Sequence, residues 1–223
     1  MRLRAEHCGH ILVLYLAVRG DFVLVGDLMK SLSVYRCSLS SGVGLIDEIA
    51  RDCSANWMTS VAFLDDDTYL GSENSLNLFV AHKNADAATD EERQRLEVVG
   101  EYHVGEFINR FRRGSLAMQV SEPGTASTPT LVFGTVNGVL GVVASLPADD
   151  FTFLSKVQAK LSLVVQGVGG LKHSEWRTFK NEHKSVQANN VLDGDLIERF
   201  LDLKRSEMEQ VLDDSAPLSR RHA

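Results

Sequence analysis

Residue types that bind metal ions gather at two places in the chain. His7, Cys8 and His10 are three candidate ligands within four residues, but tetrahedral zinc sites combine separated ligand pairs, and no distant partner accompanies this cluster. Asp65–Asp67 are consecutive carboxylates, yet they lack the glycine and the distal glutamate of a calcium loop. We therefore expect an irregular amino-terminal segment and a solvated hairpin turn, with no metal and no cofactor.

The sequence also lacks the common catalytic motifs. It has no glycine-rich phosphate loop followed by Lys-Ser/Thr, no Gly-x-Ser-x-Gly elbow and no His-Glu-x-x-His. The glycine-rich run Gly167–Gly170 follows a helical pattern, whereas a dinucleotide-binding fingerprint follows a strand. We interpret this run as a linker, and we predict that the chain is not an enzyme and has no catalytic residues.

One dense basic cluster stands in the strand-rich part of the chain, at Arg110, Arg112 and Arg113. These side chains could contact the phosphates of a nucleic acid, or they could be the charges that edge strands commonly carry. The chain has 23 Lys plus Arg against 30 Asp plus Glu, a formal net charge of −7. A broad attraction for nucleic acid is therefore not expected, and any contact with DNA would be local or indirect.

The elements that must position these groups are short strands. Three segments repeat an apolar run, a glycine, a polar turn and a second apolar run, with the pivots at Gly26, Gly71 and Gly134. Gly26 and Gly71 lie 45 residues apart, the period of a four-stranded propeller blade. We interpret each glycine as the point where the chain reverses direction, and Asn137-Gly138 is the strongest turn signal. Because a ring needs four to eight blades, about three blades indicate part of a larger propeller.

An acidic insertion separates the second and third repeats. It lies between Asp86 and Glu97, and within it Thr89 and Glu92 have the spacing of a capping box. The insertion therefore predicts one helical turn, a structural role that we favour over a binding tail. A further strand is predicted at residues 116–120, LAMQV.

The pattern changes from strands to helices near Pro147. Leu154, Val157, Leu161 and Val164 recur at helical spacing, after acidic residues that favour a helix start and before a glycine that can end the helix. A second helix is predicted to carry Trp176, Phe179 and His183 on one face, with Trp176 as the anchor of the module, and a third helix to follow Asp193. We therefore predict a partial propeller at 1–147, a small helical domain at 148–212 and a disordered tail at 213–223.

Composition bears on the compartment. Cys8, Cys37 and Cys53 form no CxxC pair and are odd in number, which favours a reducing compartment over a disulfide framework. No apolar run reaches the length of a membrane span, and the polar amino terminus differs from a signal peptide. We expect a chain of the nucleus or cytosol, with no membrane partner.

Several long segments carry a family resemblance. They are NWMTSVAFLDDDTYLGSENSLNLFV at 56–80, DEERQRLEVVGEYHVGEFINRF at 90–111, LVFGTVNGVLGVV at 131–143, HSEWRTF at 173–179 and DGDLIERFLD at 193–202. From residue 11 to 212 the chain resembles the carboxy-terminal part of the large subunits of the damaged-DNA-binding complex, the adaptors of cullin-4 ubiquitin ligases. Two of these segments also resemble large subunits of the splicing and cleavage-polyadenylation machineries, and GEFINRFRRGSL at 105–116 favours the ligase adaptors.

The resemblance implies a scaffold with three seven-bladed propellers and a carboxy-terminal helical domain. In the family the middle propeller binds the cullin, and this region is not in the present chain; the first and third propellers clamp a substrate receptor. The family also implies a nuclear, and partly cytoplasmic, role in protein ubiquitination and DNA repair. The receptor-binding positions it implies here are Leu14, Tyr15, Leu28, Lys30, Trp57, Phe107, Asn109 and Val136.

Some alternatives remain open. Lys30 replaces the arginine that the family tends to have, so a planar fork becomes a point charge. Without the resemblance, Trp57 and Phe107 would be interpreted as ordinary core residues. The competing function is that of a nucleic-acid-binding subunit of a splicing or cleavage-polyadenylation complex.

Overall fold

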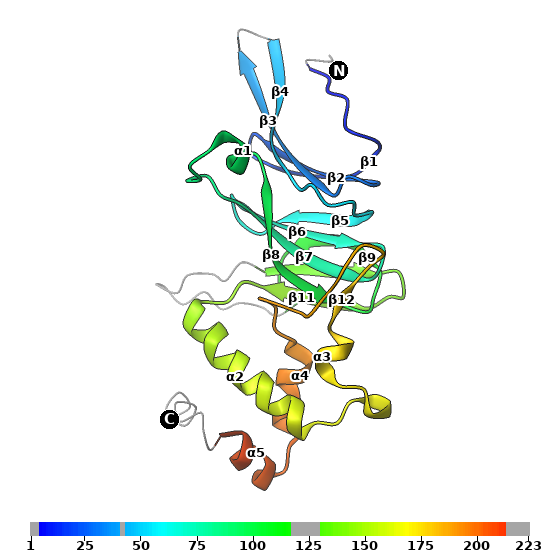
Figure 1. Cartoon of the computed structure of the whole chain (residues 1–223), viewed down its shortest axis with the longest axis vertical. Helices are drawn as coiled ribbons and strands as arrows, with labels where there is room; N and C mark the ends of the chain where they lie inside the picture. The colour runs from blue at the N-terminus through cyan, green and yellow to red at the C-terminus, as the bar shows by residue number, and fades with distance from the viewer. Residues whose placement is uncertain (1–4, 41–42, 117–129, 213–223) are drawn as a thin grey trace. The chain divides into compact units, whose positions relative to one another are not determined.

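The computed structural model describes residues 5–40, 43–116 and 130–212 (Figure 1). The chain forms two compact units. The first contains the residues up to Ser145 together with Thr178–Asn189, and the second contains Leu146–Arg177 and the residues from Asn190 onward. The strand predicted at 116–120 lies outside the described residues except for Leu116, and the tail predicted at 213–223 lies outside them.

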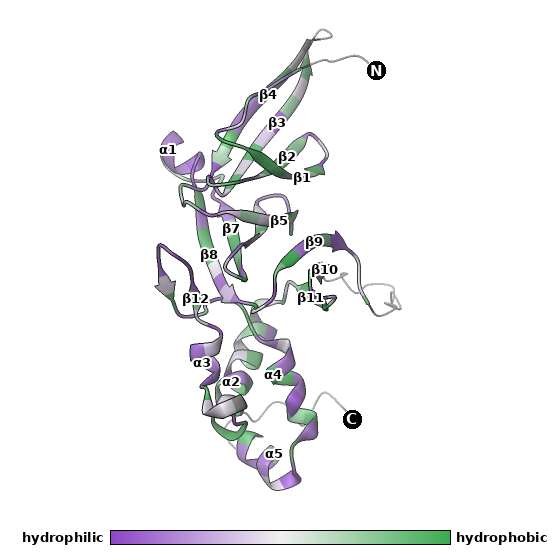
Figure 2. Ribbon diagram, turned by 90° about the vertical axis from the view of Figure 1, so that its right-hand side faces the viewer, coloured by the Kyte–Doolittle hydropathy of each residue, from purple (hydrophilic) through white to green (hydrophobic). Residues whose placement is uncertain are grey.

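The first sheet is a four-stranded antiparallel meander. Its strands follow one another in chain order, and they are β1 (Val13–Arg19), β2 (Phe22–Asp27), β3 (Leu32–Ser40) and β4 (Val43–Arg51). Polar and apolar residues are interspersed along β3 and β4 (Figure 2), and the paired residues Val34 and Ala50 of the two strands are both buried.

The second sheet repeats this order. It consists of β5 (Met58–Phe63), β6 (Thr68–Glu73), β7 (Asn77–Lys83) and β8 (Leu96–His103). The helical turn predicted in the acidic insertion is confirmed as α1 (Asp90–Arg93): Thr89 accepts a hydrogen bond from the backbone of Glu92, and the Glu92 side chain accepts one from the backbone of Thr89.

The third sheet has three described strands, in the order β11-β10-β9. They are β9 (Ile108–Arg113), β10 (Thr130–Thr135) and β11 (Leu140–Ala144). The turn predicted at Asn137-Gly138 connects β10 and β11, and Gly138 has a φ of 86°, which favours glycine.

The first strands of successive sheets adjoin, as the inner strands of propeller blades do. β5 contacts β1 and β2 on one side and β9 on the other. One apolar core joins the first two sheets through Leu24, Val34 and Met58, and another joins the second and third through Leu70 and Phe111. These described sheets do not close into a ring, so the prediction of about three blades of a partial propeller followed by a helical module is confirmed.

The prediction that Gly26, Gly71 and Gly134 reverse the chain direction is wrong. They lie inside β2, β6 and β10, and none has a positive φ. Gly26 instead permits close packing of two sheets, because a Cβ there would lie 2.7 Å from Cγ1 of Val61 and 3.1 Å from Cβ of Met58.

This contact predicts the effect of adding one methyl group. Gly26→Ala is expected to lower the free energy of unfolding of the first unit, called the β unit here, by about 1–3 kcal/mol, because β2 and β5 must move apart. Gly134→Ala is the matched control, since its Cβ would meet no atom closer than 3.9 Å. Urea denaturation measures both variants, and equal stability of the two would contradict this role of Gly26.

The second predicted helix is also wrong beyond its first turn. α3 ends at Trp176, and Phe179 begins a small hairpin of β12 (Phe179–Lys180) and β13 (Ser185–Val186). The Phe179 side chain is 1% exposed and belongs to the core of the first two sheets. The hairpin is held by Lys184, which pairs with the carboxylate of Glu101, and by the Asn77 side chain, which donates to the carbonyl of Lys180 at 2.9 Å.

The second unit is helical. Its core contains Val157, Leu161, Leu196 and Val211. Trp176, predicted as the anchor, is 44% exposed and is not part of this core. None of the described helices is long and apolar enough to cross a membrane. The elements are α2 (Ala148–Val164), η1 (Val168–Gly170), α3 (His173–Trp176), α4 (Gly194–Glu198), η2 (Arg199–Asp202) and α5 (Arg205–Leu212).

The first helix of this unit agrees with its sequence pattern. Asp149 and Asp150 lie in the first turn of α2, where their charges favour the positive end of the helix dipole. The helix ends at Val164, and Gly167 does not cap it. A Cβ on Gly167 would lie 2.1 Å from the carbonyl oxygen of Leu171, so this glycine permits a close backbone approach.

Candidate receptor-binding edge

The eight predicted receptor-binding residues lie at the same end of the strands in all three sheets. This end of the strands forms an edge, which is distinct from an outer strand. In an antiparallel meander the start of the first strand and the turn between the second and third strands are at the same edge. Every predicted position falls at one of these two places, and we call this edge the receptor edge. The first sheet contributes Leu14, Tyr15, Leu28 and Lys30, the second Trp57, and the third Phe107, Asn109 and Val136.

A β-bulge shapes the receptor edge in each sheet. The register of β1 against β2 skips Leu14, that of β5 against β6 skips Thr59, and that of β9 against β10 skips Asn109. A bulge redirects the side chains beside it and increases the local twist. Leu14 and Asn109 are exposed, whereas Thr59 is buried and its hydroxyl bonds that of Ser72 at 2.9 Å.

A polar residue ends the second strand of each sheet and steadies the following turn. Asp27, Glu73 and Thr135 occupy equivalent positions, because each pairs with the residue before the bulge. Asp27 accepts hydrogen bonds from the backbone of Met29 at 3.0 Å and Lys30 at 3.1 Å.

The same carboxylate of Asp27 also fixes the segment that precedes β1. Its other oxygen accepts from the backbone of Leu12 at 2.9 Å and Ile11 at 3.2 Å. Burial would raise the pKa of Asp27, but the four backbone donors outweigh burial and the pKa lies below its ordinary value of 3.8. One buried carboxylate therefore holds the two segments that carry Leu14 and Lys30.

A pocket of about 350 Å³ opens on the receptor edge beside the second sheet. Leu28 and Trp57 line it, and Trp57 is 51% exposed, so the alternative that Trp57 is a core residue is wrong. Burial raises the pKa of Glu73 in the wall of the pocket, against the opposing hydrogen bond from Asn77. The pocket thus combines an exposed aromatic ring with a buried acid.

Sequence reasoning missed part of this pocket. Its lining includes Met29, an exposed apolar residue in a turn, which is a detectable signal. Asn181 and His183 of the β12–β13 hairpin also line it, and the Asn181 side chain donates to that of Asn56 at 3.3 Å. No local pattern indicates these two residues, because a distant contact brings the hairpin there.

The remaining predicted residues do not share this pocket. Phe107 and Val136 are joined by a backbone hydrogen bond of 3.0 Å from Val136 to Phe107. Tyr15 lines a different groove, together with Arg110, Arg112 and Arg113. Lys30 is exposed. The receptor edge is therefore a discontinuous surface rather than one cavity.

The residues considered as metal ligands have other contacts. His10 bonds the carboxylate of Glu48 at 2.7 Å, and the ring of His7 packs on Tyr35 at 4.8 Å. Asp65–Asp67 form the turn between β5 and β6, as predicted. No group of three His, Cys, Asp or Glu residues that could hold a metal ion occurs within residues 5–40, 43–116 and 130–212.

Antiparallel blades with adjoining first strands, followed by a helical unit, define a propeller-type β protein. The family model described as the CPSF A subunit region matches residues 1–202. The chain belongs to this family.

Curated relatives within the family are more specific. The chain is 59% identical over 211 residues to DNA damage-binding protein 1 of Solanum lycopersicum, a match that covers 95% of this chain. It is 58% identical to DNA damage-binding protein 1a of Arabidopsis thaliana and 56% identical to DNA damage-binding protein 1 of Oryza sativa subsp. japonica, each over 92% of the chain. The chain spans 19% of the length of these relatives. The resemblance seen in the sequence is thus confirmed as homology.

Proposed function

We propose that this chain is a protein-binding module of a cullin-4 ubiquitin ligase adaptor. Homology to proteins named DNA damage-binding protein 1 supports a role in the response to DNA damage, and we place that role in the nucleus. The module binds substrate receptors, makes no covalent bond and acts as a scaffold. Cullin binding belongs to another part of the adaptor, and damaged DNA is contacted indirectly.

The observation that carries the proposal is the exposure of apolar side chains on the receptor edge. Trp57 is 51% exposed, Val136 66% and Met29 55%. Exposed aromatic and apolar residues beside a pocket are typical of binding hot spots. The amphipathic helix of a receptor would place its apolar side chains against them, and Asn109 would offer a donor and an acceptor to its polar groups.

A change in one tryptophan tests this function. Trp57→Ala is expected to weaken capture of a purified cullin-4 substrate receptor at least tenfold, because a central aromatic hot spot contributes about 2 kcal/mol or more. Asn109→Ala is expected to weaken capture less. A titration of the receptor by biolayer interferometry measures both.

The chain offers a matched control. Trp176 is the other tryptophan and is 44% exposed in the helical unit. Trp176→Ala should leave receptor capture unchanged. Capture that survives both Trp57→Ala and Asn109→Ala would contradict the proposed function, as would equal losses from the two tryptophan variants.

A further inference from the structure

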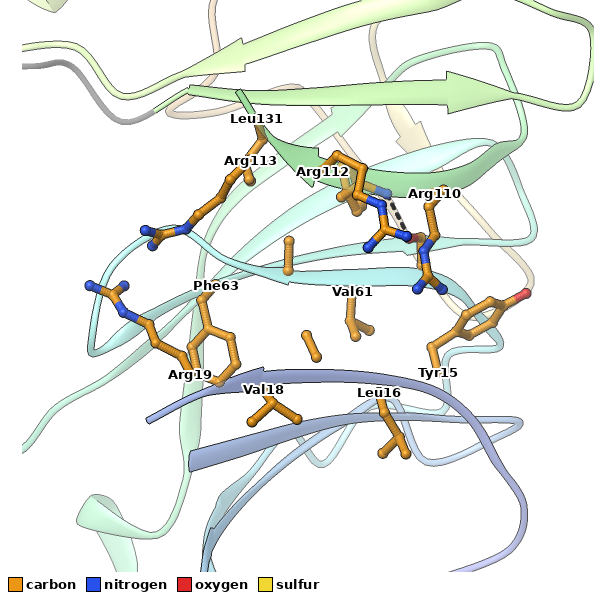
Figure 3. A pocket seen from close by; sticks show the side chains of 14 residues that line it. Tyr15, Leu16, Val18, Arg19, Val61, Phe63, Arg110, Arg112, Arg113 and Leu131 are labelled. Atoms are coloured by element: carbon orange, nitrogen blue, oxygen red, sulfur yellow. Dashed lines mark hydrogen bonds between the residues drawn. The ribbon is translucent and has the colours of Figure 1, made fainter. Parts of the chain in front are cut away.

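A second concave site lies where the first strands of the three sheets adjoin. It is a groove of about 410 Å³ lined by residues of β1, β5 and β9, and we call it the arginine groove (Figure 3). Val61 and Phe63 line it with apolar surface and are 7% and 6% exposed. Its volume is in the range of small-ligand sites.

Four guanidinium groups surround this groove. Arg110, Arg112 and Arg113 come from β9 and Arg19 from the end of β1. Figure 3 shows Arg19 and Arg113 near each other at one end, with Arg110 beside Tyr15 at the other. No Asp or Glu is among the described residues that line the groove.

Among the described residues, only one acid neutralises any of the four arginines. Arg110, Arg112 and Arg113 make no ion pair with any described residue within 4.0 Å. Arg19 pairs through Nη2 with Asp66 at 3.0 Å, but its Nη1 is buried and has no hydrogen-bond partner among the described residues. This donor of a groove-lining arginine is therefore available to an acceptor group.

The fold itself places the arginines. The bulge at Asn109 shifts the alternation of buried and exposed side chains along β9. Arg110 and Arg112 are therefore exposed, while Phe111 between them is buried. The backbone N–H of Phe111 donates to Oγ of Ser60 at 3.2 Å, which fixes β9 against β5. The backbone that carries Arg110, Arg112 and Arg113 is therefore fixed in place against β5, while their exposed side chains can still adjust to a ligand.

We infer that the arginine groove binds a compact polyphosphate, a small molecule that carries several phosphates close together. Guanidinium groups bind phosphate oxygens through paired hydrogen bonds, and four of them match several phosphates. A long nucleic acid fits less well, because the chain has a net charge of −7 and would repel phosphates outside the groove. This inference does not rest on the proposed receptor function.

Tripolyphosphate is a suitable probe. We expect it to bind the full chain with one site in isothermal titration calorimetry. The double substitution Arg110→Gln and Arg113→Gln should weaken binding about a hundredfold, or about tenfold for each lost charge-assisted contact. Arg36→Gln is the control, because Arg36 is exposed on β3 and does not line the groove.

The outcomes separate the possible ligands. Loss of binding in the double variant, with the melting temperature unchanged and Arg36→Gln still binding, supports the inference. No binding to the unsubstituted chain, or equal weakening by Arg36→Gln, overturns it. Tighter binding of a twelve-nucleotide single-stranded DNA than of tripolyphosphate, lost in the same double variant, overturns it in favour of nucleic-acid binding.

Discussion

Asp193→Ala is expected to lower the free energy of unfolding of the helical unit by about 3–5 kcal/mol. The carboxylate of Asp193 is 5% exposed and accepts hydrogen bonds from Nε of Arg177 and Nε2 of His173, both at 2.7 Å. Arg177 is itself only 11% exposed, so removing the carboxylate takes an opposite charge at 2.7 Å away from a buried guanidinium. Asp193 also caps α4 by accepting from the backbone of Leu196.

Acid should have the same effect as this substitution. Burial would raise the pKa of Asp193, but the hydrogen bonds from Arg177 and His173 outweigh it and the pKa lies below its ordinary value of 3.8. A carboxyl group with a lowered folded pKa contributes its full stabilisation above the unfolded pKa of about 4, and loses it as the pH falls through the folded value. The helical unit should therefore lose this stabilisation below about pH 4.

A single tryptophan can report on each unit. In a Trp57→Phe background the fluorescence of Trp176 reports urea unfolding of the helical unit. Asp195→Asn is the matched control, because Asp195 is exposed and stands two residues away. If Asp195→Asn and Asp193→Ala destabilise the unit equally, the buried ion pair is not the cause. An unfolding free energy of Asp193→Ala that falls as steeply with acid as that of the unsubstituted chain would also contradict it.

Asp193 also shows what a sequence pattern conveys and what it omits. The segment Asp193–Leu196 was recognised by resemblance and as a helix start, and both expectations are confirmed. The ion pair with Arg177 and His173 was not predicted. Those residues belong to a separate segment, and only the folded unit brings the two together, so spacing along the chain carries no signal for their contact.

The glycines show the opposite problem, in which a correct repeat was assigned the wrong cause. The blades were predicted correctly from the periodic glycines, but Gly26 permits close packing against Val61 and does not form a turn. Glycine is favoured both where φ is positive and where two backbones approach closely. Sequence alone does not distinguish these two causes, because the neighbouring sheet defines the second.

The helix predicted through Phe179 is wrong for a third reason. Trp176, Phe179 and His183 have helical spacing, but the Phe179 side chain fits the core between the first two sheets. Tertiary burial of one aromatic ring outweighs a short local pattern, because short isolated helices are marginal in water. The hairpin residues of the receptor-edge pocket were missed with it, whereas the edge residues implied by the family resemblance do fall on one edge.

Asp27→Ala is expected to lower the free energy of unfolding of the β unit by about 2–4 kcal/mol, because it leaves four backbone donors without an acceptor. These donors recover hydrogen bonds to water only if the loops that contain them move, since Asp27 is 3% exposed. The loops that move carry Leu14 and Lys30. We therefore expect receptor capture to weaken as well, even at temperatures where the variant stays folded.

Two further variants separate positioning from stability. Asp27→Asn keeps one acceptor oxygen, which can hold the backbone of either Met29 and Lys30 or Ile11 and Leu12. Its losses of stability and of receptor capture should therefore be about half of those caused by Asp27→Ala. Asp21→Ala is the control, because Asp21 is exposed in the turn at the opposite edge of the same sheet. In a Trp176→Phe background, the fluorescence of Trp57 reports unfolding of the β unit. Normal receptor capture by folded Asp27→Ala would show that this carboxylate stabilises the sheet without shaping the receptor edge.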